Sequence, residues 1–210
     1  MLLRTALPLL LALGSLTACR PMLYPFARAF GSPSEGELKL RRAAFNRLKA
    51  QRGAWRIVVY PMLDPTGRRQ ETFPGCAETA AAILRDRGLA GAAAGEAPPT
   101  VPARALGGNQ LRYLQDRAAA YGGWMKEARP AADAAVFMEV LVDGSGTISG
   151  LHMVVVEASG QVAYTRLFNS HHFGPNPPSG GDAACRLLAR VLLRDLERPA
   201  EELHPPYGVG

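Results

Sequence analysis

The sequence predicts an α+β fold: a mixed sheet, with one or two parallel strands and a three-stranded antiparallel meander, covered by helices. Two observations predict the sheet. Three β-rich runs, 134–142, 147–157 and 161–168, are separated by short glycine-bearing turns, which is typical of a meander. The run 55–62 is short and nearly all apolar, as expected of a strand buried on both faces, and it can join the meander.

The third observation is a set of segments with apolar residues three and four positions apart, which predicts the covering helices. These segments are 37–52, 76–88, 111–125 and 182–197. The segment 90–102 is rich in Ala, Gly and Pro, so we expect mostly loop there, although 100–103 could form a short edge strand. In the run 147–157 both alternating sets of side chains are apolar, which predicts an interior strand covered on both faces.

The first residues have the layout of a secretory signal peptide. Arg4 gives a positive start, and the apolar stretch 6–13 is too short to span a bilayer. Leu16-Thr17-Ala18-Cys19 looks like a lipobox, so we expect cleavage before Cys19 and lipid, palmitate included, on this cysteine. Arg20 stands where an inner-membrane retention signal would place Asp, which favours the periplasmic face of the outer membrane. The alternative is an ordinary signal peptide in which Cys19 is incidental.

The chain divides by composition into four parts. These are a signal peptide (1–18), a lipidated Pro-containing tether (19–36), one periplasmic domain (37–198) and a Pro-rich tail (199–210). The net charge of +6 is mild, and no Lys/Arg run is long enough to predict nucleic-acid binding. The densest basic stretch, within 39–52, is expected to be a solvated helix face, with contact to anionic lipid headgroups as the alternative.

Two further cysteines, Cys76 and Cys185, are expected to form a disulfide in an oxidising compartment. The alternative is a thiol-dependent peptidoglycan or peptide hydrolase. Cys76 follows Pro74-Gly75 at the start of a helix, where the helix dipole would lower the pKa of its thiol, and His152 and Asn169 follow in the order of papain-like enzymes. The residues around Cys76 lack the signatures of those families, so we expect no catalytic residue.

No metal or cofactor site is expected. His171-His172 are adjacent and would point opposite ways in an extended chain, so a surface loop is favoured there. His152 shares a strand face with Ile148 and Val154, which favours a hydrogen-bonded histidine in the core. The sequence has no nucleophile elbow, phosphate-binding loop, zinc-protease motif or Cys-x-x-Cys pair. A binding protein is therefore favoured over an enzyme.

The run Arg56-Ile-Val-Val-Tyr-Pro-Met-Leu-Asp64 resembles the first strand and following loop of periplasmic lipoproteins related to CsgG, LpoB and the amino-terminal domain of TolB. Residues 132–137 and 155–162 resemble a strand start and a hairpin typical of that group, and the resemblance covers about 37–198. It implies a non-enzymatic accessory or assembly factor that binds envelope proteins. The chain lacks an obvious pore-forming hairpin, so a secretion channel is not implied. We expect contact through the loops 63–75 and 169–181, with partner and oligomeric state left open.

Overall fold

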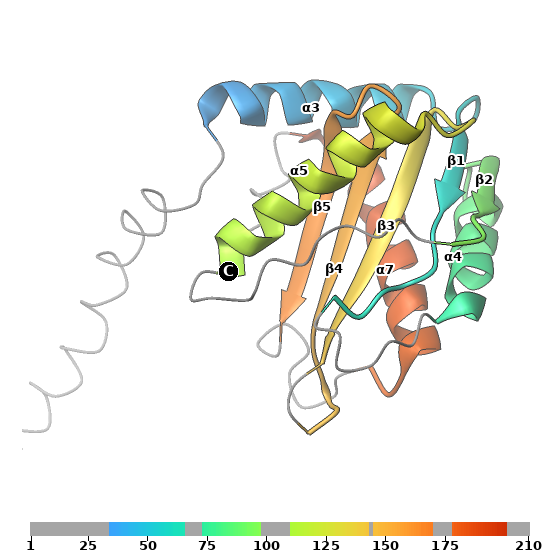
Figure 1. Ribbon diagram of the computed structural model, residues 1–210. Helices are drawn as coiled ribbons and strands as arrows, with labels where there is room; N and C mark the ends of the chain where they lie inside the picture. The colour runs from blue at the N-terminus through green and yellow to red at the C-terminus, as the bar shows by residue number, and fades with distance from the viewer. Residues whose placement is uncertain (1–33, 66–72, 98–109, 143–144, 170–177, 201–210) are drawn as a thin grey trace, which may run out of the picture.

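The computed structural model describes residues 34–65, 73–97, 110–142, 145–169 and 178–200 (Figure 1). Those residues hold four helices: α3 (Glu35–Ala50), α4 (Pro74–Asp86), α5 (Gln110–Ala128) and α7 (Gly181–Leu196). They hold five strands: β1 (Arg56–Val59), β2 (Gly91–Ala94), β3 (Ala134–Val142), β4 (Ile148–Glu157) and β5 (Val162–Asn169). The predicted signal peptide, Cys19 and His171-His172 lie outside the described residues.

The five strands form one sheet in the order β2-β1-β3-β4-β5. Strand β1 is parallel to both β2 and β3, while β3, β4 and β5 form an antiparallel meander. All nine residues of β3 are buried, as are the last eight of β4, because helices cover both faces of the sheet. The predicted α+β class, the meander and the interior position of the 147–157 strand are confirmed.

Strand β2 corrects the prediction for 90–102, where we expected mostly loop. Its sequence, Gly-Ala-Ala-Ala, has little intrinsic preference for a strand, so no local pattern indicated it. The strand forms because the chain leaves α4 through Gly88, at φ +101°, and returns beside β1 in parallel. Gly91 is required for this pairing, since a Cβ there would lie 2.2 Å from the Trp55 carbonyl oxygen. The edge strand considered at 100–103 lies outside the described residues.

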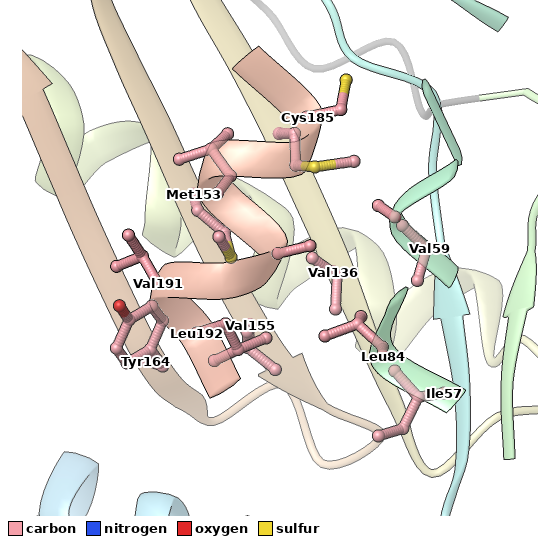
Figure 2. Packing of buried hydrophobic residues seen from close by; sticks show 14 of the residues in the cluster. Ile57, Val59, Leu84, Val136, Met153, Val155, Tyr164, Cys185, Val191 and Leu192 are labelled. Atoms are coloured by element: carbon pink, nitrogen blue, oxygen red, sulfur yellow. The ribbon is translucent and has the colours of Figure 1, made fainter. Parts of the chain in front are cut away.

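Helices cover both faces of the sheet (Figure 1), and the two largest clusters of buried apolar residues lie on opposite faces. Helices α4 and α7 cover one face, and the larger cluster lies between them and the sheet. Figure 2 shows part of this cluster, including Ile57, Leu84, Met153 and Leu192. Helix α5 covers the other face, where its residues pack on β1, β3 and β4. The two faces therefore present different surroundings to successive residues of each strand.

Helix α3 lies across the end of the sheet (Figure 1). The Ser34 side chain caps it by accepting a hydrogen bond from the Glu37 amide at 3.2 Å. Phe45 and Leu48 are buried in the larger cluster, and the Phe45 ring stacks on Tyr164 of β5 with centroids 5.9 Å apart. None of the helices within the described ranges is long and apolar enough to cross a membrane.

Candidate functional site

The predicted disulfide between Cys76 and Cys185 is present in the structure. Cys76 lies in the first turn of α4 and Cys185 near the start of α7, with Cα atoms 5.6 Å apart. Both residues are buried, at 3% and 0% exposure. The bond joins the starts of two helices that are 109 residues apart in the chain.

The disulfide also joins the segments that lead into α4 and α7. The Phe73 ring, just before α4, lies against Gly181, where a Cβ would come within 2.3 Å of it. Thr79 donates a hydrogen bond to Asp182 at 3.2 Å. The end of the loop 63–75 that leads into α4 and the end of the loop 169–181 that leads into α7 therefore adjoin each other.

The residues of the thiol-hydrolase alternative are not brought together. Cys76 is bonded to Cys185 on the α4 and α7 face. His152 points to the α5 face, where it contacts Glu139, and Asn169 pairs with Gly150 at the end of β5. A sulfur held in a disulfide has no thiolate, so Cys76 in this state cannot act as a nucleophile.

A buried polar cluster lies beneath α5 and consists of Arg117, Tyr121, Glu139 and His152, hereafter the Glu139 cluster. Glu139 and His152 are opposite each other on β3 and β4, and both are 0% exposed. The Glu139 carboxylate accepts hydrogen bonds from Arg117 Nε at 2.7 Å, the Tyr121 hydroxyl at 2.5 Å and His152 Nδ1 at 2.9 Å. Arg117 Nη2 also contacts Glu139 and donates to the Tyr121 hydroxyl at 2.8 Å.

The carboxylate of Glu139 is ionised within this cluster. Burial alone raises the pKa of Glu139, but its hydrogen bond with His152 and its interactions with Arg117 and Tyr121 outweigh burial and lower the pKa to about 2. Burial raises the pKa of the Tyr121 hydroxyl well above its usual value, and Glu139 raises it further, so Tyr121 stays protonated and donates. Since a carboxylate only accepts, His152 Nδ1 carries the proton of their shared hydrogen bond.

Aromatic rings and apolar side chains close the surroundings of the cluster. The Tyr121 ring stacks on Phe137 at 4.1 Å, and Phe137 in turn stacks on Tyr60 at 5.3 Å. Among the described residues, His152 Nε2 and the hydroxyl of Tyr113 are buried without a hydrogen-bond partner. Each side chain of the Glu139 cluster is at most a few per cent exposed, so solvent and substrates do not reach it in this conformation.

This cluster therefore has the properties of a structural ion-pair network that fixes α5 on the sheet. Strongly shifted pKa values also mark active sites, but an active site needs an open path to its reacting group. Within the described ranges, no three His, Cys, Asp or Glu side chains are grouped so that they could hold a metal ion.

The prediction that His152 is a hydrogen-bonded core histidine is confirmed, but its partners were not predicted. Glu139 is the one acidic residue in the otherwise apolar run 134–142, and such a residue in a buried strand indicates a buried partner. Arg117 lies on the apolar stripe of α5, three positions after Leu114 and four before Tyr121. These two signals together could have indicated the pair.

No protein-family model, curated protein or solved structure matches this chain. The resemblance to lipoproteins related to CsgG, LpoB and TolB therefore stays a prediction.

Proposed function

We propose that this protein is an exported lipoprotein, anchored through lipid on Cys19 at the periplasmic face of the outer membrane, and that its domain acts as a non-enzymatic accessory or assembly factor for envelope proteins. The buried Cys76–Cys185 disulfide carries the proposal. Disulfides persist in oxidising compartments such as the periplasm and are rare in the cytosol. The residues 16–19, which look like a lipobox, would direct export and lipidation, and a disulfide is compatible with such a compartment.

Protein binding is supported by the position of the loops 63–75 and 169–181. The ends that lead into α4 and α7 adjoin, and the disulfide joins these two helices near their starts. Binding residues commonly lie on loops held by such a scaffold. Helix α3, the first described element of the chain, lies at the other end of the sheet (Figure 1). Lipid anchoring at one end would leave these loops free to meet a partner in the periplasm.

The non-enzymatic part of the proposal is supported by two features. The thiol of Cys76, the strongest candidate for a nucleophile, is occupied by the disulfide. The ionised Glu139, which has the most perturbed environment of the described carboxylates, is sealed under α5. The resemblance to the CsgG, LpoB and TolB group points the same way.

Anchoring is tested by fractionating cells that produce either the natural chain or Cys19→Ser. The natural chain is expected in the membrane fraction, resistant to high salt. The variant is expected to lose this attachment because the cysteine thioether is the site of lipidation. Equal membrane attachment of both chains would refute the anchor.

Partner binding is tested with a photo-crosslinking residue at exposed Ser179, beside α7, in cells where the lipoprotein is abundant. The matched control carries the same residue at exposed Glu127, near the end of α5. Crosslinks to an envelope protein from position 179 but not from 127 are expected. Absence of any envelope-protein crosslink at 179, together with a pull-down that recovers none, would refute the binding function.

A further inference from the structure

The sulfurs of Cys76 and Cys185 are buried in the folded domain. Cys76 is 3% exposed and Cys185 is 0% exposed, and both belong to the larger apolar cluster, part of which surrounds Cys185 in Figure 2. A disulfide forms by thiol–disulfide exchange, in which one sulfur attacks another directly and a mixed disulfide is the intermediate. An oxidant therefore cannot reach these two cysteines while α7 is packed on α4.

Helix α7 brings the two cysteines together and covers them. It is the last helix that the structure describes, and Cys185 lies on its buried stripe with Leu188 and Leu192. Cys76 lies on α4, 109 residues earlier in the chain. Before α7 docks, Cys76 is open to a reagent from the side that α7 later covers, and Cys185 is not yet beside it.

The two thiols occupy different positions in their helices. Cys76 is the third residue of α4, so it lies in the first turn, where the helix dipole favours a thiolate, and that turn has no acidic residue. Cys185 is the fifth residue of α7, and the effect of the dipole falls off within the first turn. Cys76 is therefore the better attacking thiolate of the pair.

We infer that the disulfide forms by thiol–disulfide exchange before α7 docks, with Cys76 forming the mixed disulfide with the oxidant and Cys185 resolving it. The Cys76 thiolate attacks a disulfide of the oxidant and expels one of its sulfurs as a thiolate. The Cys185 thiolate then attacks the Cys76 sulfur, forms the native bond and expels the second sulfur of the oxidant. Two electrons pass to the oxidant, which becomes a dithiol and takes up the two protons that the cysteines release.

This inference deepens the proposed function and rests on the proposed export. It gives the exported chain a transient partner of stated chemistry, a periplasmic oxidoreductase with a reactive disulfide. The chain has three cysteines, and the proposed lipid on Cys19 removes the third thiol, because a thioether does not take part in exchange. Lipidation would thus prevent Cys19 from pairing with Cys76.

The first test uses the full lipidated chain in detergent, reduced in urea and then diluted into native buffer. Oxidised glutathione is added either at dilution or after refolding has ended. Oxidation is expected to be at least about tenfold slower in the second case, because buried thiols react only when the structure opens. A reduced chain that stays unfolded by circular dichroism also supports the inference, since oxidation then precedes docking. Equal rates for a reduced chain that is folded would overturn it.

Single-cysteine chains test the order of attack. Cys185→Ala retains Cys76 and Cys76→Ala retains Cys185, so each chain stops at the mixed disulfide with glutathione, which mass spectrometry detects. When glutathione is added at dilution, the adduct is expected to form at least about twofold faster at Cys76. In urea, which removes α4, the two rates should be equal. An equal or faster rate at Cys185 in native buffer would overturn the order.

The same spectra separate this inference from the proposed anchor. Each cysteine lies in its own peptide, so the rates at Cys76 and Cys185 are read independently of Cys19. A glutathione adduct on Cys19 would refute the lipid anchor and leave the order of exchange to be decided by the other two peptides.

Discussion

At the residue scale, Glu139 is the most consequential polar side chain of the described core. Its carboxylate is fully buried and receives donors from both a neighbouring strand and α5. Burial of a charge is unfavourable unless partners compensate, and removal of one partner leaves the other charge uncompensated. The Glu139 cluster therefore makes the position of α5 sensitive to single substitutions beneath it.

Glu139→Gln is expected to lower the free energy of unfolding by about 3 to 5 kcal/mol, because it leaves the buried Arg117 guanidinium without a counter-charge. Urea unfolding followed by circular dichroism measures this change. Glu78→Gln, at an exposed site, is the control and should stay within about 0.5 kcal/mol of the natural chain. Replacing both Glu139 and Arg117 with Met removes both charges and should recover much of the loss. A loss below about 1 kcal/mol for Glu139→Gln would contradict this account.

The same carboxylate predicts how stability depends on acid. The pKa of Glu139 is lowered from 4.5 to about 2, so its contribution is fully present above pH 4.5 and is lost as the pH falls through about 2. This contribution amounts to about 3 kcal/mol. Asp182 also has a lowered pKa, because of its hydrogen bond with Arg186, and would add its own dependence on acid. It is therefore replaced by Asn in every chain whose unfolding is compared. If the free energy of unfolding falls equally with acid in chains with and without Glu139→Gln, then Glu139 does not cause this pH dependence.

Sequence reasoning succeeded at single residues where the chemistry left few choices. Two cysteines in a chain that we expected to be exported predicted the disulfide, and an apolar strand face predicted the core position of His152. It failed for the partners of His152, because pairing across β3, β4 and α5 depends on register and helix placement. The spacing of residues within one segment predicts neither the register between strands nor the placement of a helix on the sheet.

At the scale of elements, periodic apolar residues predicted helices and long strands because each pattern is local. Strand β2 was missed because pairing with β1, and not its own composition, makes it a strand. Helix α5 was predicted, but not its close approach to the turn between β4 and β5. A Cβ on Gly122 would lie 2.5 Å from the Gly160 carbonyl oxygen, so this contact requires glycine.

Adjacent glycines in α5 test that contact. Gly122→Ala is expected to destabilise the protein by about 1 to 3 kcal/mol, since α5 or the turn at Gly160 must shift. Gly123→Ala meets nothing within 4 Å and should stabilise by up to about 1 kcal/mol, because alanine favours a helix. Thermal unfolding of the two variants measures both effects. Equal effects of the same sign would show that helix propensity alone governs these positions.

At the scale of the whole molecule, the disulfide connects the starts of α4 and α7 across a long loop of chain. Replacing Cys76 and Cys185 together with Ala is expected to cost about 2 to 4 kcal/mol of unfolding free energy, because the unfolded chain gains freedom. Urea unfolding of this variant, compared with the oxidised natural chain, gives the value. Reductant should destabilise the natural chain and leave the variant unchanged. Equal sensitivity of both chains to reductant would contradict a structural disulfide.

Mass spectrometry of the protein extracted from membranes, alkylated before and after reduction, tests the lipid anchor and the disulfide in one experiment. We expect a chain that begins at Cys19, carries lipid on that residue and alkylates at Cys76 and Cys185 only after reduction. An unmodified Cys19 would contradict the lipid anchor. Alkylation of Cys76 without reduction would contradict the disulfide on which the proposed compartment and the non-enzymatic function depend.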